Sequence, residues 1–379
     1  MKKTGRFISA AAVVLLGTAL AIIGHTSDSP ASRMTEQALL PMPEDHVMDW
    51  RDKNLEAAMR EITGIAEGDI MLSDVWDETM LRLNGKQIKD ISALGELINL
   101  TSLTLSWNEI SDITPLSELV NLTDLYAMGN WISDISPLAG LANLTDIHLL
   151  DNEISDITPL AGLTNLEYLR LSYNEINDIS PLAGLTNLEE LELDGNRISD
   201  VTPLAGLGNL SLLELRGNQI SDVTPLASLT NLYWLALSGN EINDVTPLSG
   251  LLNLTDLYLE NNGISDVTPL AGLTNLDDLR LSYNEISDVA PLADLMNLTW
   301  LELHVNRISD VTPLASLSNL WYLDLNNNEI SDVAPLTGLP NLHVLSLEHN
   351  PVNDLTPLSE LANLKELIVD RQMDKTDQN

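Results

Sequence analysis

The sequence predicts an α/β solenoid, in which equivalent coils stack and their short strands form one curved parallel β-sheet. The dipeptide Asn-Leu recurs thirteen times at a constant spacing of 22 residues, from Asn99 to Asn363, without one insertion. A fixed period of this length is typical of repeat architectures. Each unit also contains a segment in which leucine alternates with variable residues, as in a short strand with one buried face. Counting these segments from Leu81 to Leu367 gives about 14 strands.

One unit explains why the coils must stack. From Asn253 it reads NLTDLYLENNGISDVTPLAGL, which contains the leucine-rich pattern L-x-x-L-x-L-x-x-N-x-I. Leu257 and Leu259 point to one side of the strand, and Ile264 and the apolar residues after it turn back toward the same interior. A single coil cannot bury these side chains, but neighbouring coils bury one another. We therefore expect a leucine-rich repeat horseshoe with a concave β-sheet and short 3-10 or helical turns on its convex side. The proline of each Ser/Thr/Ala-Pro-Leu segment suits the first turn of such a helix.

Two polar residues recur in every unit and are interpreted as structural. The asparagine series runs from Asn108 to Asn350, and a buried amide in a stack must bond the backbone of neighbouring coils. The aspartate series runs from Asp90 to Asp354, and its position before each turn indicates capping. The Asn-Leu-Thr/Ser sequences match the glycosylation sequon, but as part of the repeat their asparagines are expected to be inaccessible.

The regions that flank the repeats suggest export. Three cations, Lys2, Lys3 and Arg6, precede an apolar run, so residues 1–24 are predicted to be a signal peptide or an N-terminal membrane anchor. Whether it is cleaved stays open. Residues 25–46 form a linker, 47–77 a helical N-terminal cap, 78–371 the repeats and 372–379 a C-terminal tail. The expected location is secreted or tethered to the outer face of the membrane by that segment alone. The last coil needs a cover, for which the tail or end-to-end pairing of two chains is suggested.

The repeats resemble those of the internalin family of bacterial surface proteins. The resemblance rests on the 22-residue unit, its Asn-x-Ile-(Ser/Asn)-Asp-(Ile/Val)-(Thr/Ser/Ala)-Pro-Leu run, and the preceding segment that begins at Asp52. That segment looks like the family's helical cap, and Leu55, Met59 and Ile62 lie on one helical face suited to covering the first coil. The resemblance implies a recognition module whose partner varies between members. The chain departs from the family in having neither a following immunoglobulin-like domain nor an L-P-x-T-G sorting signal.

Composition narrows the function further. With 18 Lys+Arg against 56 Asp+Glu, a formal net charge of -38 argues against nucleic-acid partners. The absence of cysteine excludes disulfides and thiolate chemistry. Glu190 and Glu192 have a spacing that suits glycoside hydrolysis, but a smooth sheet offers no dry pocket, so no enzyme is expected. His304, His349 and Glu348 make only a loose metal set, so no metal and no cofactor are expected.

Function is expected where the repeat varies, at the four outward positions of each strand on the concave face. These positions hold nine of the 14 Trp and Tyr residues, far more than random placement would give. Aromatic side chains gathered on an exposed surface indicate binding. The nine are Trp107, Tyr126, Tyr168, Tyr173, Trp234, Tyr258, Tyr283, Trp300 and Tyr322.

Two mixed patches of aromatic and charged residues are the candidate ligand-binding sites. The larger comprises Trp234, Tyr258, Asp278, Arg280, Tyr283, Trp300, Glu302, Tyr322 and Asp324, and the smaller comprises Tyr168, Arg170, Tyr173, Glu190 and Glu192. The segment 169–176 recurs at 279–286, so the patches can stem from an internal duplication.

The favoured function is adhesion or cell-surface recognition of a protein partner, ideally one with a basic surface. A cell-wall or host polysaccharide is the alternative, because aromatic rings can stack on sugars. A cytosolic scaffold like the phosphatase-regulating members of this repeat class is disfavoured by the N-terminal segment.

Overall fold

The computed structural model describes residues 39–370, and the predicted signal segment lies outside them. The chain divides into two units, residues 1–41 and 42–379, and the second contains all the repeats. Within the described residues, no helix has both the length and the apolarity needed to cross a bilayer.

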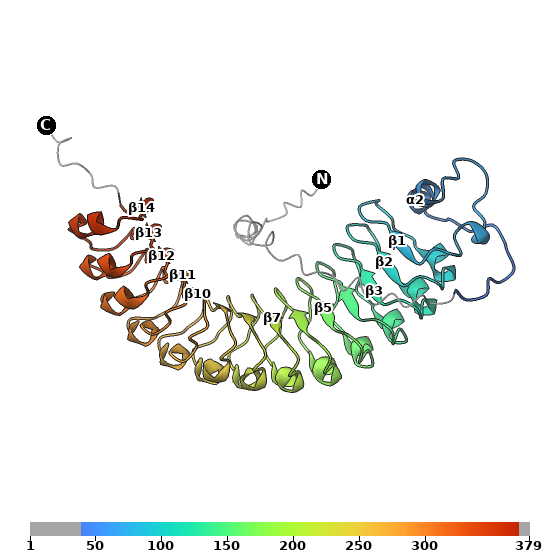
Figure 1. Cartoon of the computed structure of the whole chain (residues 1–379). Coiled ribbons are helices and arrows are strands. Elements are labelled where there is room, and N and C mark those ends of the chain that lie inside the picture. Colours follow the sequence, from blue (N-terminus) through green and yellow to red (C-terminus); the bar gives the residue numbers. More distant parts are fainter. Residues whose placement is uncertain (1–38, 371–379) are drawn as a thin grey trace, which may run out of the picture. The chain divides into compact units, whose positions relative to one another are not determined.

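Residues 42–370 form a curved stack in which one sheet lines the inner side and short turns line the outer side (Figure 1). Fourteen strands follow one another in chain order, and every neighbouring pair is parallel. This confirms the predicted solenoid and its strand number. The strands are β1 Met80–Arg82, β2 Ser102–Thr104, β3 Asp124–Tyr126, β4 Asp146–His148, β5 Tyr168–Arg170, β6 Glu190–Glu192, β7 Leu212–Glu214, β8 Trp234–Ala236, β9 Asp256–Tyr258, β10 Asp278–Arg280, β11 Trp300–Glu302, β12 Tyr322–Asp324, β13 Val344–Ser346 and β14 Glu366–Ile368.

The register of the sheet is the same at every step. Each residue pairs with the one 22 positions later, as Leu81 does with Leu103 and Arg280 with Glu302. The central leucine or isoleucine of strands β1 to β13 is buried in the core. The residues on either side of it face the concave surface, where equivalent positions form continuous rows across the strands.

The convex side is built from 3-10 turns, as the Pro-Leu segments predict. In twelve of them a proline occupies the first helical turn. From Ser92–Glu96 onward, the aspartate two residues before each turn caps it; Asp112 Oδ1, for example, accepts a hydrogen bond of 2.8 Å from the Thr114 amide. The turns span Leu72–Asp74, Ser92–Glu96, Thr114–Glu118, Ser136–Leu138, Thr158–Leu160, Ser180–Gly184, Thr202–Gly206, Thr224–Ser228, Thr246–Gly250, Thr268–Leu270, Ala290–Leu292, Thr312–Ser316, Ala334–Gly338 and Thr356–Glu360.

The repeated asparagine joins consecutive coils, which confirms its structural role. The Asn218 side chain is 8% exposed, and its Oδ1 accepts a hydrogen bond of 3.0 Å from the Ile198 amide in the preceding coil. Its Nδ2 donates to the carbonyl of Leu193 in the preceding coil and to that of Leu215 in its own coil. One amide therefore satisfies three backbone groups that the core would otherwise leave unpaired.

The N-terminal cap contains a single α-helix, α2 (Lys53–Thr63). Asp52 caps its start by accepting from the amides of Asn54 and Leu55, and Gly64 ends it with a positive φ of 74°. Leu55 and Met59 are buried against the first coils. The expectation that Ile62 shares this role is wrong, because that side chain is 39% exposed.

A second expectation also fails, for the sequon asparagines. Four of them, Asn143, Asn209, Asn253 and Asn297, are exposed on the convex edge. Their Nδ2 atoms nevertheless donate to a carbonyl of the preceding coil, as Asn143 does to Val120 at 2.8 Å. The residues are thus exposed and at the same time held in place.

The C-terminal end of the sheet is less covered than its interior. Leu367 on β14 is 38% exposed, whereas the equivalent Leu345 on β13 is fully buried. The tail that was suggested as a lid lies outside the described residues, so tail capping and end-to-end pairing both stay predictions.

We predict that Asn218→Ala lowers the free energy of unfolding by at least about 2 kcal/mol, since it leaves buried backbone groups without partners. Asn177→Ala is the matched control, because Asn177 is exposed in the segment between β5 and the next 3-10 turn. It should change stability by no more than about 0.5 kcal/mol. Urea denaturation followed by circular dichroism measures both. Equal effects of the two substitutions would contradict the role assigned to the asparagine series.

Candidate binding site on the concave face

Four aromatic side chains and one arginine form a continuous ribbon across β8 to β12. Trp234 meets Tyr258 edge to face, with 4.9 Å between ring centroids. The Arg280 guanidinium lies 4.5 Å from the Tyr258 ring centroid and 5.7 Å from that of Trp300. Trp300 stacks on Tyr322 at 3.8 Å with an angle of 6° between the ring planes. Arg280 therefore joins two aromatic pairs by cation–π contacts, and we call these five residues the aromatic ribbon.

Carboxylates hold the aromatic ribbon in this arrangement. Asp278 accepts from Arg280 Nη2 at 2.8 Å and from the Tyr258 hydroxyl at 3.1 Å. Glu302 accepts from Trp300 Nε1 at 2.8 Å and lies 3.7 Å from Arg280 Nη1. Arg280 and Glu302 lie side by side because they occupy equivalent positions, 22 residues apart, in consecutive coils. The ribbon is thus a pre-organised surface whose single cation is matched by two anions.

The ribbon's members differ in accessibility. Tyr258 is only 6% exposed, because Trp234 and Arg280 cover it, so it supports the surface more than it presents one. Trp300 and Tyr322 are part-exposed. Two residues outside the four positions considered in the sequence extend the surface: Trp321, which is 44% exposed and stacks with Trp300, and His343, which stacks on Trp321 at 5.5 Å. Their position immediately before each strand could have revealed them.

Two members of the larger predicted patch belong to a neighbouring group instead. Tyr283 is 53% exposed in the loop after β10 and meets His304 edge to face at 4.9 Å. His304 Nδ1 in turn lies 3.2 Å from Asp324 Oδ2. Burial opposes protonation of His304, but the hydrogen bond and negative charge of Asp324 hold its pKa above the ordinary value. His304 thus connects the two predicted residues.

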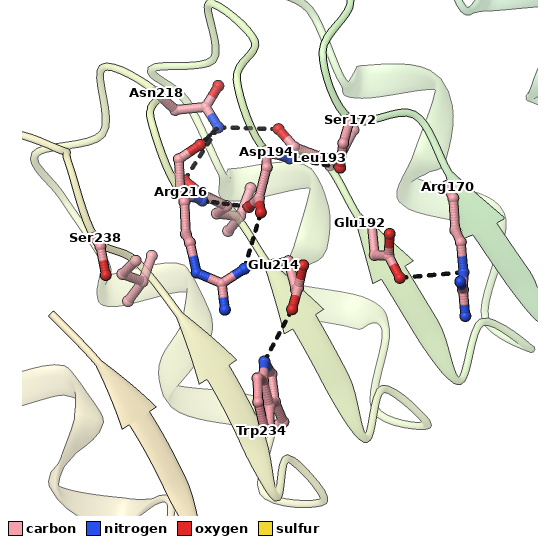
Figure 2. Close-up of polar contacts among 12 residues, drawn as sticks. Arg170, Ser172, Glu192, Leu193, Asp194, Glu214, Arg216, Asn218, Trp234 and Ser238 are labelled. Carbon is pink, nitrogen blue, oxygen red and sulfur yellow. Dashed lines mark hydrogen bonds and ion pairs between the residues drawn. The ribbon is translucent and has the colours of Figure 1, made fainter. Parts of the chain in front are cut away.

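The smaller predicted patch is held together by Arg170. Its Nη2 lies 3.2 Å from Glu190 and its Nε 3.1 Å from Glu192 (Figure 2 shows the second pair). Tyr168 donates from its hydroxyl to Glu189 at 3.4 Å. Tyr173 stands apart from these residues on the loop edge, where its ring packs against Gly195, so no contact joins it to Arg170 among the described interactions.

A group of polar contacts that the sequence analysis did not single out lies between the two patches and is joined to the larger one (Figure 2). Arg216 Nη1 lies 2.9 Å from Asp194 and 3.0 Å from Glu214. Glu214 also accepts from Trp234 Nε1 at 3.1 Å. The Arg216 guanidinium reaches to 5.4 Å from the centroid of Tyr258. Asp194, Arg216 and Glu214 therefore extend the larger patch toward the smaller one.

Burial raises the pKa of two carboxyl groups on this part of the concave face, Glu192 and Asp194. Burial raises the pKa of Glu192 to about 7, against the opposing charge of Arg170, and nearby carboxylates add to the shift. Burial likewise raises the pKa of Asp194, although Arg216 opposes the shift. Both carboxyl groups therefore change charge near neutral pH.

Another cluster lies on β3 and β4. The Tyr126 hydroxyl donates to Asp146 Oδ2 at 2.6 Å, and His148 Nε2 lies 2.9 Å from Asp146 Oδ1. The rings of Tyr126 and His148 meet edge to face at 4.5 Å. Asp146 thus lies between the two rings, with one oxygen bonded to Tyr126 and the other near His148. Among residues 39–370, no group of three or more His, Asp or Glu side chains is arranged to hold a metal ion.

The loop edge carries a further set of exposed rings. Trp107 is 57% exposed and its ring lies over Gly129, where an added Cβ would come within 2.3 Å of the indole. Tyr173 lies over Gly195 in the same way, at 2.6 Å. Glycine is needed at these two positions for the space that the rings occupy. The positive φ alone does not require it, because Trp107 and Tyr173 adopt the same positive φ at the equivalent position of their coils.

We predict that lowering the pH from 8 to 5 raises the free energy of unfolding by about 1–3 kcal/mol through Glu192 and Asp194. Their folded pKa values lie above those of the unfolded chain. The unfolded state therefore loses its protons first as pH rises, and stability falls between about pH 4.5 and 7.

The double variant Glu192→Gln, Asp194→Asn should flatten this pH dependence in urea denaturation. Asp222→Asn is the control and should keep it, because hydrogen bonds from Thr224 hold the pKa of Asp222 below its ordinary value. An unchanged slope in the double variant would contradict the assignment.

Comparisons with known proteins agree with this geometry. The family model described as Leucine Rich repeats (2 copies) matches residues 120–162, 164–206, 252–295, 297–338 and 318–363, and a single Leucine Rich repeat matches residues 96–113. No curated protein gives a significant match to the sequence.

Three solved structures are similar to the chain. An internalin (inlF) from Listeria monocytogenes is 38% identical, with a TM-score of 0.82; the match covers 85% of this chain and 96% of that one. The functional domain of InlJ, also from Listeria monocytogenes, is 23% identical over 87% of this chain and 76% of that one, with a TM-score of 0.69. The plant peptide hormone receptor RGFR1, solved in complex with RGF2, is 22% identical over 79% and 53%, with a TM-score of 0.68. The last two show the fold alone, whereas the first shows that the chain belongs to the internalin family of leucine-rich repeat proteins.

Proposed function

We propose that the chain is a non-enzymatic recognition module that binds a protein partner on its concave face, centred on β8 to β12. The observation that carries this proposal is the aromatic ribbon. Its rings are not needed for the core, which Leu, Ile and Val fill. Side chains of Trp, Tyr and Arg dominate the energetics of protein interfaces, and here they are fixed before a partner arrives.

The charge of the face suits a partner with basic groups. Each concave arginine in this region lies between two carboxylates, so the surface stays negative after internal pairing. A negative field steers a basic partner toward the rings and disfavours acidic ones. The peptide bound by the plant receptor of the same fold is consistent with a polypeptide as ligand.

The proposed location is the bacterial cell surface or the extracellular medium. The basic and apolar segment at residues 1–24 supports this, together with membership of the internalin family. Fractionation of the producing cells with N-terminal sequencing of the exported protein tests it. Recovery of the protein in the cytosol with residue 1 intact would contradict it.

A polysaccharide is the second candidate ligand, favoured by the exposed and stacked ring of Trp321. The two ligands differ in their response to salt. Binding of a basic protein weakens as ionic strength rises, whereas binding of a neutral glycan is nearly indifferent.

We predict that the double variant Trp300→Ala, Tyr322→Ala weakens partner binding at least about tenfold. The full chain is used to capture partners from host-surface and cell-wall fractions, and affinity is then measured for the captured partner at low and high salt. Circular dichroism and urea denaturation verify that the variant keeps its fold.

Trp131→Ala is the matched control, because this ring is 50% exposed on the loop edge, away from the ribbon. It should bind like the wild type. Unchanged affinity in the double variant would remove the aromatic ribbon from the interface.

A further inference from the structure

Arg82 differs from the other arginines of the repeats. On the concave face, Arg170, Arg216 and Arg280 each have two carboxylate partners. On the loop edge, Arg197 pairs with Glu175 and Arg307 with Glu285. Arg82 on β1 is exposed, and among residues 39–370 no carboxylate pairs with it.

The outward positions of β1 and β2 carry no acidic residue. The outward positions of β1 and β2, together with the loop positions after them, carry Met, Arg, Asn, Gly, Ser, Thr, Ser and Trp. Thr104 lies beside Arg82 in the sheet register, and its buried Oγ1 makes no hydrogen bond. Asp124 on β3 is two strands away, about 10 Å across the sheet, and accepts from the Thr123 hydroxyl.

One exposed apolar side chain lies on the same strand and face as Arg82: Met80 is 46% exposed. In a chain with 56 acidic residues, an exposed arginine that pairs with no described carboxylate is available to an anion from outside. The rest of the concave face, with its excess of carboxylates, repels the same anion.

We propose that Arg82, Met80 and Thr104 form a subsite for an acidic side chain of the protein partner. The inference rests on the proposed function and adds an orientation to it. The partner's acidic residue lies over β1 and β2, where Arg82 pairs with it, while its basic and aromatic residues lie over β6 to β12. The ten strand steps from β1 to β11 span about 48 Å, which an extended segment of about 15 residues covers.

Selection from a library of random 16-residue peptides tests this without knowledge of the natural partner. The full chain is used as bait in four forms: wild type, Arg82→Gln, Arg82→Glu, and Arg197→Gln as the matched control. Wild type and Arg197→Gln should enrich peptides with Asp or Glu at one position, well separated from basic residues. Arg82→Gln should lose this enrichment, and Arg82→Glu should replace it with Lys or Arg.

A double-mutant cycle then links the two side chains. Replacing the enriched acid by its amide in one selected peptide should weaken binding to the wild type about tenfold, and should have no further effect on Arg82→Gln. Denaturation midpoints confirm that the exposed Arg82 variants remain folded.

The outcomes separate the two proposals. Peptides that require Trp300 and Tyr322 but bind wild type and Arg82→Gln equally would overturn the subsite and leave the proposed function standing. If the wild type retains no peptide above background, the result counts against the proposed function and the subsite together.

Discussion

From Asn108 to Asn350, one side-chain amide in each coil bonds the backbone of that coil and of the coil before it, and the rest of the structure depends on this link. Each amide fixes the distance and the phase between two coils. Twelve such amides join the coils of β1 to β13, and all thirteen neighbouring strand pairs keep the same register. The functional surface follows from that register, because side chains 22 residues apart in sequence become direct neighbours on the concave face.

These rows make charge pairing across strands almost unavoidable. Arg170 reaches Glu192, and Arg280 reaches Glu302, because each pair occupies equivalent positions in consecutive coils. Pairing fixes the long arginine side chains, which lowers the entropy that they would lose on binding. Glu192 and Asp194 are also buried beside other carboxylates. Burial raises their pKa values toward neutral pH.

Much of this could be predicted from the sequence, since period and pattern determine strands, turns and rows. The roles of the repeated asparagine and aspartate follow from the same logic. The repeat period does not determine how the side chains on the concave face pack against one another. Tyr258 is buried because Trp234 and Arg280 cover its ring and the Arg216 guanidinium also lies near it. Tyr173 separates from Arg170 because Gly195 in the next coil offers its ring a place to pack. Ile62 and four of the sequon asparagines are exposed for a similar reason, because a position on a helical face or in a repeat does not specify what covers the side chain.

The uninterrupted 22-residue period has a consequence for how such a surface can change over generations. Each coil contacts its neighbours through the same amide and in the same register. After loss or gain of one whole unit by in-frame recombination, the remaining coils could therefore pack against one another as before. The identical segments 169–176 and 279–286 are the pattern that such an exchange would leave. Shortening or lengthening the gene by single units would then move one end of the concave face relative to the other in steps of about 5 Å, and would retune partner choice while leaving each coil's own fold untouched.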